Sequence, residues 1–314
     1  MSTLLKSSDH NSDHAVAGAI SGFISRFLCQ PLDVVKIRFQ LQVEPVTNHH
    51  VSKYKSLSQA FFLIFKEEGL FALWKGHVPA QSLSIVYGMS QFSSYNVFMK
   101  GLDNFSLLNE YKYSTKFIAG AGAGSVATIV SFPFDTIRTR LVAQSNNHQV
   151  YKGVFHCCSC ILRQESPITF FRGLLPTLLQ IVPHTGLQFA FYGFFNDIYK
   201  KYSNEIDTSF TNSIMSGSAA GLLAKTAIYP FDLSRKRLQI QGFQHGRKHF
   251  GAFFYCTGLI DCLKVTFKVE GVKGLFKGLV PSQLKATITT ALHFATYEQS
   301  LKLLKAMRQY TSEK

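Results

Sequence analysis

Long apolar runs recur along the chain, separated by shorter polar stretches. Two of these runs, 78–99 and 173–196, contain no Asp, Glu, Lys or Arg. Each is long enough for a helix to cross a bilayer, which takes about 20 apolar residues. Four more runs are of similar length but carry Ser, Thr, Gln and single charges. The pattern predicts six membrane-spanning helices, at about 15–40, 78–99, 115–142, 173–196, 212–239 and 280–301.

Polar residues inside such helices are costly in lipid unless they face a wet interior. Glycines four residues apart, as at Gly18 and Gly22, recur in the first, third and fifth runs and allow helices to approach closely. We therefore expect an all-α membrane protein whose six helices surround a water-filled cavity. Amphipathic segments such as 57–68 connect the helices of each pair.

Two short motifs occur three times each and in the same order. The first reads "PLDVVK" from Pro31, "PFDTIR" from Pro133 and "PFDLSR" from Pro230. The second reads "EGLFALWKG" from Glu68, "ESPITFFRG" from Glu165 and "EGVKGLFKG" from Glu270. Self-similarity at about a hundred residues indicates an internal repeat. The predicted division is a tail at 1–13, repeats at 14–107, 108–204 and 205–306, and a tail at 307–314.

The first motif places a proline, an acid and a base on one helix. The proline removes a backbone hydrogen bond and kinks the helix. The acid and the base, three residues apart, lie near one face of it. In a threefold bundle, the acid of one repeat can therefore meet the base of the next repeat.

The charge balance narrows the class of partner. The chain has 33 Lys and Arg against 18 Asp and Glu, a formal net charge of +15. Such a balance suits polyanions. Nucleic acid is not expected, because the bases recur at helix ends and loops and no recognition module is present. No nucleophile, base and orienting group occur in a plausible set, so the chain is not expected to be an enzyme.

The six cysteines show no regular disulfide framework. His156, Cys157, Cys158 and Cys160 in "FHCCSC" resemble a zinc half-site, but no second ligand pair follows at finger spacing, so we expect reduced thiols and no metal.

The first 14 residues have no apolar core and no arginine. They match neither a secretory signal nor a mitochondrial presequence, so any targeting signal is expected to be internal.

Over residues 14–306 the chain resembles the mitochondrial carrier family, whose repeats carry P-x-[DE]-x-x-[KR] and then [DE]-G-x-x-x-x-aromatic-[KR]-G. The resemblance implies a multi-pass transporter of the inner mitochondrial membrane that works by alternating access. It also implies a gate on the matrix side, formed by ion pairs between repeats. The pairs would be Asp33 with Arg138, Asp135 with Arg235, and Asp232 with Lys36.

The sequence departs from the family pattern at several positions. Gln40 and Gln239 match the glutamine that often braces a gate pair, whereas Val142 stands in its place in the second repeat. Ser166 replaces the glycine of the second motif. On the cytoplasmic side the family has aromatic-acid-x-x-base motifs. In the matching stretches of this chain, only Glu298 keeps the acid. We expect a weak cytoplasmic gate made by Tyr95, Tyr192, Tyr297 and Glu298.

Five residues before each signature proline stand Arg26, Thr128 and Lys225. Bases at this depth indicate a functional site, and with no acid in their own ring they predict a site for an anion. Alternatively, each base pairs with another acid or a backbone carbonyl. Family-type contact positions on the even-numbered helices would add an aromatic face, amides and a third base. These positions are Tyr87, Gln91, Gln180, Ile181, His184 and Lys285.

Local strings such as "KIRFQLQ" from Lys36 and "YPFDLSRKRLQIQGF" from Tyr229 resemble family members that carry thiamine pyrophosphate. That resemblance implies thiamine pyrophosphate as a transported substrate, exchanged against nucleotides, and no cofactor. Two alternatives are a carrier for other nucleotides or coenzyme A, and a substrate-independent leak of protons or ions. The expected partners are the small anion and inner-membrane lipids, with cardiolipin as a candidate, and a monomer is expected to suffice.

Overall fold

The computed structural model describes residues 2–43, 53–103, 112–144, 149–202, 209–243 and 255–312. This part of the chain is helical throughout and contains six long helices. They are α1 (Ser2–Leu41), α3 (His77–Asp103), α5 (Lys112–Ala143), α7 (Leu174–Tyr202), α8 (Ser209–Gln239) and α10 (Leu279–Ser312). Each expected span lies within one of these helices to within one residue, so the six-helix prediction is confirmed.

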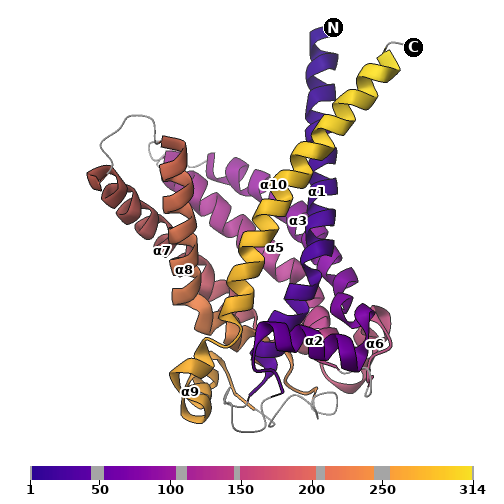
Figure 1. Ribbon diagram of the computed structural model, residues 1–314, viewed down its shortest axis with the longest axis vertical. Coiled ribbons are helices and arrows are strands. Elements are labelled where there is room, and N and C mark those ends of the chain that lie inside the picture. The colour runs from indigo at the N-terminus through magenta and orange to yellow at the C-terminus, as the bar shows by residue number, and fades with distance from the viewer. Residues whose placement is uncertain are drawn as a thin grey trace.

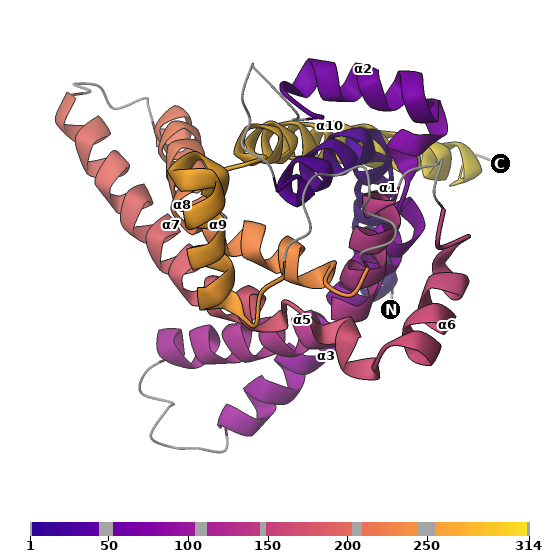
Figure 2. The same ribbon diagram turned by 90° about the horizontal axis from the view of Figure 1, so that it is seen from below.

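The long helices are arranged around a common axis, with both termini at one end (Figure 1). The most extensive helix packing joins α3 to α5, α7 to α8 and α10 to α1. Each of these pairs joins two different repeats, and the three pairs are seen side by side around the centre in Figure 2. Contacts between repeats therefore dominate the bundle.

Short helices cover the end of the bundle that lies away from the termini (Figure 1). They are α2 (Leu57–Glu68) with the 3-10 turn η1 (Leu70–Trp74), α6 (Val154–Gln164) with η3 (Pro167–Phe171), and α9 (Leu259–Leu275). The bounds of α2 match the predicted amphipathic segment. Ser56 caps α2 by accepting a hydrogen bond from the Gln59 backbone N–H at 3.3 Å. Ala60 and Ile64 turn inward, whereas Phe62 is exposed.

The signature prolines Pro31, Pro133 and Pro230 lie inside α1, α5 and α8, and each helix continues beyond its proline. In the second motif, Gly69 and Gly271 adopt φ of 81° and 69°, a conformation that favours glycine. Ser166 adopts φ −123° and ψ 150°, and Pro167 follows it at the start of η3. The second repeat thus makes its turn through an extended residue, which explains why glycine is not needed there.

Among the described residues, one helical stretch, Ile118–Ala143, is long and apolar enough to cross a membrane by length and composition alone. The apolar stretches of the other long helices are interrupted by Ser, Thr, Gln and other polar residues. This is the pattern expected of helices that face both lipid and a polar interior. Large apolar side chains such as Phe92, Phe189 and Phe294 remain exposed, which suits a surface covered by lipid.

Candidate functional site

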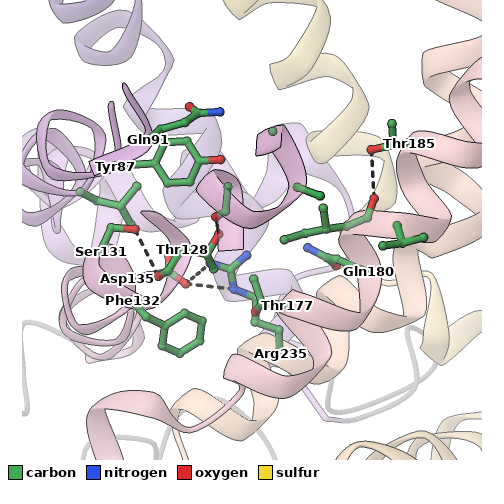
Figure 3. A pocket seen from close by; sticks show the side chains of 16 residues that line it. Tyr87, Gln91, Thr128, Ser131, Phe132, Asp135, Thr177, Gln180, Thr185 and Arg235 are labelled. Carbon is green, nitrogen blue, oxygen red and sulfur yellow. Dashed lines mark hydrogen bonds and ion pairs between the residues drawn. The ribbon is translucent and has the colours of Figure 1, made fainter. Parts of the chain in front are cut away.

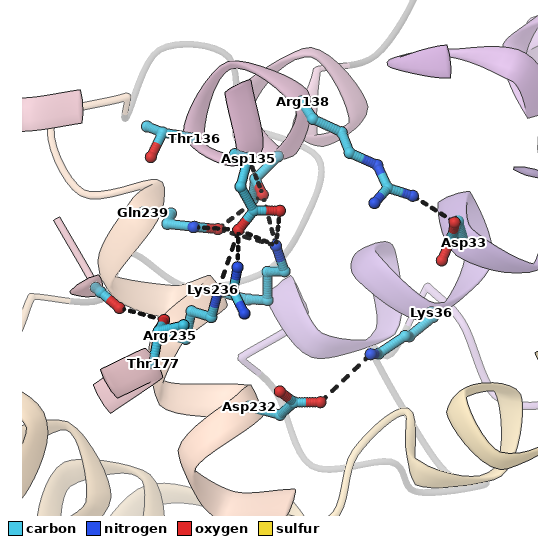
Figure 4. Close-up of polar contacts among 12 residues, drawn as sticks. Asp33, Lys36, Asp135, Thr136, Arg138, Thr177, Asp232, Arg235, Lys236 and Gln239 are labelled. Atoms are coloured by element: carbon cyan, nitrogen blue, oxygen red, sulfur yellow. Dashed lines mark hydrogen bonds and ion pairs between the residues drawn. The ribbon is translucent and has the colours of Figure 1, made fainter. Parts of the chain in front are cut away.

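The signature acids and bases of the three repeats lie near one another and form a ring of ion pairs (Figure 4). The structure brings together the partners that the repeat pattern predicts. The ion pairs are Asp33 with Arg138, Asp135 with Arg235 at 2.7 Å, and Asp232 with Lys36 at 3.4 Å. Because each acid meets a base from another repeat, the ring links α1, α5 and α8, which are the first long helices of the three repeats.

The three acids of this ring are nearly buried. Asp33, Asp135 and Asp232 expose 4%, 3% and 7% of their surface. A buried carboxylate is costly unless it is paired and hydrogen-bonded. Each acid accordingly has a second basic partner. These partners are Lys285 for Asp33 at 2.6 Å, Lys236 for Asp135 at 2.9 Å, and Lys225 for Asp232 at 2.5 Å.

Lys236 was not predicted as part of the ring. It directly follows the signature base Arg235, and its Nζ also donates to Thr139 Oγ1 at 3.0 Å. The run of three bases at 235–237 was the available signal, since only the third repeat has it. Asp135 is consequently the acid with the most donors from one neighbouring helix.

The two glutamines expected as braces have different partners. Gln239 Nε2 donates to Asp135 Oδ2 at 2.6 Å, and Gln239 Oε1 accepts from Thr139 Oγ1 at 2.8 Å. Gln40 Nε2 instead donates to the Tyr229 hydroxyl at 3.0 Å, and its Oε1 has no partner in the described part of the chain. Gln239 thus supports an ion pair directly, whereas Gln40 is bound to a tyrosine.

A further set of ion pairs lies outside the ring and was missed from the sequence. It joins the arginine two residues beyond each signature base to the glutamate of the second motif in the same repeat. The pairs are Arg38 with Glu68 at 2.6 Å, Arg140 with Glu165, and Arg237 with Glu270 at 2.6 Å. The recurrence of this arginine in all three repeats was the signal that could have found it.

These pairs attach each short helix to the end of its neighbouring long helix. Glu68 shows the electrostatic effect. Burial opposes its ionisation, but hydrogen bonds from Arg38 and Lys75 outweigh burial and lower the pKa of Glu68 from 4.5 to about 2. Glu68 is therefore ionised at neutral pH.

The same arginines also bind backbone carbonyls of the next repeat. Arg38 Nε donates to the Val142 carbonyl at 3.3 Å, and Arg140 Nε donates to the Gln239 carbonyl at 3.3 Å. Arg237 Nε closes the cycle by donating to the Gln40 carbonyl at 3.2 Å. The last carbonyls of a helix lack partners within the helix. Each of these arginines therefore caps the C-terminal end of the first long helix of the next repeat.

A cavity of about 570 Å³ lies above the ring, between α3, α5 and α7 (Figure 3). Of the predicted contact residues, the structure places five on its lining: Tyr87, Gln91, Thr128, Gln180 and Ile181. The Asp135–Arg235 pair lies at its base. Apart from this pair, the polar groups on the lining are hydroxyls and amides. Gln180 Oε1 is buried and has no hydrogen-bond partner among the described residues.

The predicted bases do not line this cavity, and His184 does not line it either. Arg26 Nη1 donates to the Ala80 carbonyl at 3.1 Å. Lys225 and Lys285 pair with acids of the ring. The expectation of a basic site without acids of its own therefore needs a correction. No acid lies at the level of Arg26 and Lys225 in the sequence, but Lys225 reaches Asp232 two helical turns along α8, and Lys285 on α10 reaches Asp33 on α1.

At the opposite end, the residues expected for a cytoplasmic gate are spread over three helices. Tyr297 on α10 contacts α1, where its hydroxyl lies 2.5 Å from His14 Nδ1. Glu298 pairs with Lys302 one turn along the same helix at 2.9 Å, and both side chains are largely exposed. Tyr95 and Tyr192 are half-buried on α3 and α7.

No group of three or more His, Cys, Asp or Glu side chains is placed to hold a metal ion in the described ranges. Cys157 is fully buried, and Cys158 and Cys160 are half-buried. Burial raises the pKa of the Cys157 thiol to about 12. Cys160 Sγ lies 3.6 Å from His156 Nε2, one turn before it on α6.

Comparison with known proteins agrees with this geometry. The mitochondrial carrier protein family matches the chain three times, at residues 7–106, 109–203 and 207–308. The human mitochondrial thiamine pyrophosphate carrier is 41% identical over 291 residues, covering 91% of this chain and 90% of the human one. The Macaca fascicularis protein of the same name is also 41% identical, over 290 residues and with the same coverage.

A more distant relative, the mitochondrial thiamine pyrophosphate carrier 1 of Coccidioides immitis (strain RS), is 36% identical over 293 residues and 90% of both chains. The threefold family match accounts for the three copies of each motif. The chain therefore belongs to the mitochondrial carrier family, whose members are multi-pass transporters of the inner mitochondrial membrane.

Proposed function

We propose that the protein transports thiamine pyrophosphate across the inner mitochondrial membrane and exchanges it against nucleotides. The observation that carries the proposal is the similarity to thiamine pyrophosphate carriers along nine-tenths of both chains. The chemistry of the bundle supports it, because uncharged polar groups and bases occupy different sides of the interior. A substrate with a heteroaromatic end and an anionic end would use both.

The cavity between α3, α5 and α7 suits the heteroaromatic end. Tyr87 offers an aromatic face for stacking, and Gln91 and Gln180 offer amide groups. The Gln180 Oε1 acceptor lacks a protein partner, so a ring amino group could donate to it. The pairing of an aromatic face with amides favours a nitrogen heterocycle over an aliphatic chain.

Arg26, Lys225 and Lys285 suit the diphosphate end. An arginine can hold phosphate oxygens in a bidentate manner, whereas a lysine acts as a compact charge. Thr128 occupies the equivalent position in the second repeat and binds its own helix, with Oγ1 2.7 Å from the Gly124 carbonyl. The basic groups are thereby confined to α1, α8 and α10. Their placement would orient the substrate across the bundle.

The ring of ion pairs would act as the matrix gate. An ion pair with some access to water contributes about 0–1 kcal/mol, so three pairs make a latch that a bound substrate can open. A substrate shifts this equilibrium only by its different affinity for the closed and open states. The tyrosines at the other end would form a weaker cytoplasmic gate. Because one chain encloses its own pathway, a monomer would suffice.

The test is uptake of labelled thiamine pyrophosphate by liposomes that contain the protein. The liposomes are preloaded with thiamine pyrophosphate, with a nucleotide or with buffer. We expect saturable uptake only with an internal substrate. Arg26→Ala and Lys225→Ala should each abolish it, whereas Lys305→Ala, which removes an exposed lysine of α10 outside the site, should retain it.

Other outcomes separate the alternatives. Rapid nucleotide exchange without thiamine pyrophosphate uptake would retain the carrier and overturn the substrate. Ion conductance without any substrate would indicate a leak. Uptake that survives both site substitutions would show that Arg26 and Lys225 do not bind the substrate.

A further inference from the structure

The six bases of the ring differ in their access to water. The side chains of Lys225 and Lys285 are 27% and 28% exposed. Those of the remaining four bases are exposed by 9% to 19%: Arg138, Lys236, Lys36 and Arg235. Lys225 and Lys285 are therefore the bases of the ring that are most accessible to a dissolved anion.

Both lysines now neutralise acids of the ring. Lys225 Nζ lies 2.5 Å from Asp232 Oδ2, closer than Lys36 Nζ, which lies 3.4 Å from the same atom. Lys285 on α10 lies 2.6 Å from Asp33 on α1. Asp135 differs from these two acids, because its second base, Lys236, is only 10% exposed and is also bound to Thr139 and Gln239.

We infer that the diphosphate group of a substrate and the acids Asp33 and Asp232 compete for the ammonium groups of Lys225 and Lys285. This inference rests on the proposed function and adds a coupling step to it. A lysine ammonium is compact, has three donors and sits on a flexible stem, so it can change partners without backbone movement. It is never left as an unpaired charge, since a phosphate replaces the carboxylate.

The exchange alters the ring in a defined way. When phosphate takes Lys285, Asp33 retains Arg138 as its one basic partner in the ring. When phosphate takes Lys225, Asp232 retains only the interhelical pair with Lys36. Coupling between two binding events is reciprocal. A lysine–carboxylate pair therefore weakens substrate binding by the same factor by which the bound substrate weakens that pair. The substrate and the gate thereby share two charges.

The test uses inorganic pyrophosphate as the probe, with affinity measured by calorimetry on the protein in lipid nanodiscs. Asp33→Asn and Asp232→Asn each release one exposed lysine, and we expect about two- to fivefold tighter binding, the range for one partly wet ion pair. Asp135→Asn is the matched control. This substitution removes the same charge from the same ring without releasing an exposed lysine. Its gain in pyrophosphate affinity should therefore be smaller than that of Asp33→Asn or Asp232→Asn.

A double-mutant cycle isolates the coupling. The gain from Asp232→Asn should vanish in a Lys225→Gln background, and the gain from Asp33→Asn should vanish with Lys285→Gln. Equal gains in all three Asn variants would show that a loosened gate is responsible and would overturn the inference. No gain in any of them, or a gain that persists without the lysine, would overturn it as well.

A second measurement leaves the gate acids unchanged. A carbodiimide joins an adjacent lysine and carboxylate directly, so mass spectrometry of the parent protein can count the Lys225–Asp232 and Lys285–Asp33 links. Pyrophosphate should lower both yields relative to the Lys236–Asp135 link, and an unchanged ratio contradicts the exchange. Since pyrophosphate lacks the thiamine ring, these results stand apart from the test of the substrate itself.

Discussion

Gly173 lies directly against the backbone of Arg235. A Cβ placed on Gly173 would come within 2.8 Å of the Arg235 carbonyl oxygen, and Gly173 has φ of 86°. A Cβ placed on the equivalent glycines Gly76 and Gly278 would lie 3.2 Å from the carbonyl oxygens of Arg138 and Lys36, respectively. The glycine that ends the second motif of each repeat thus packs against the signature base of the next repeat.

This relationship predicts the effect of Gly173→Ala. The added methyl group would meet backbone atoms, and alanine is disfavoured at positive φ, so we expect a loss of about 1–3 kcal/mol. The clash would also disturb the ion pair of Arg235 with Asp135. The measurement is thermal unfolding in lipid nanodiscs. Gly186→Ala on the same helix, where a Cβ meets no atom within 4 Å, is the control and should not be destabilised.

The two glutamines predict a difference between Gln239→Ala and Gln40→Ala. Gln239 donates to the buried Asp135, so its removal should cost about 1–3 kcal/mol and weaken the ring of ion pairs directly. Gln40 donates to Tyr229, so its removal should reduce stability without a direct effect on an ion pair of the ring. Transport and unfolding measured together would separate these effects. The same change in transport rate in both variants would contradict the prediction.

Glu68 predicts a pH dependence. Its pKa is lowered from 4.5 to about 2 in the folded protein, so its ionised form stabilises the fold. That contribution is complete above pH 4.5 and is lost as the pH falls toward 2. At neutral pH, Glu68→Gln should cost about 3 kcal/mol, from 1.36 kcal/mol per pKa unit. The difference in unfolding between parent and variant should shrink below pH 4.5, and a constant difference would be inconsistent with this cause.

The three cysteines of α6 should react at different rates. Cys157 is fully buried, and its pKa is raised to about 12, so little thiolate is present at neutral pH. Cys158 and Cys160 are half-buried. A maleimide at pH 7 should label these two well before Cys157 in the native protein. Labelling of all three after denaturation is the control, and early labelling of Cys157 would argue against its burial.

The amino-acid sequence determined the repeat, the six long helices and the partners within the ring. Its signals are local: apolar runs of bilayer length, and a proline, an acid and a base in fixed order. Such signals can be detected in the sequence because each depends only on the residues of one helix and on the face on which they lie. The threefold repeat predicted that an acid of one repeat meets a base of another, and the family resemblance implied the pairing of Asp33 with Arg138.

Residues whose partners come from distant segments were predicted less well. Lys225 was expected to be available to an anion, yet its ammonium lies against Asp232. Gln40 was expected beside an ion pair and instead binds Tyr229. In both cases the side-chain rotamer and the depth of the neighbouring helix decide the contact, and no local pattern encodes either.

The sequence by itself therefore determined what each repeat is made of, since helix length, kink and charge are properties of one segment. Only the tertiary structure decided how charge is distributed within the interior. It placed uncharged polar groups beside α3, α5 and α7, gave every buried acid a second base, and left Lys225 and Lys285 the most exposed of those bases. The physical reason is that a buried charge takes the nearest available counter-charge, and which one is nearest depends on all six helices together.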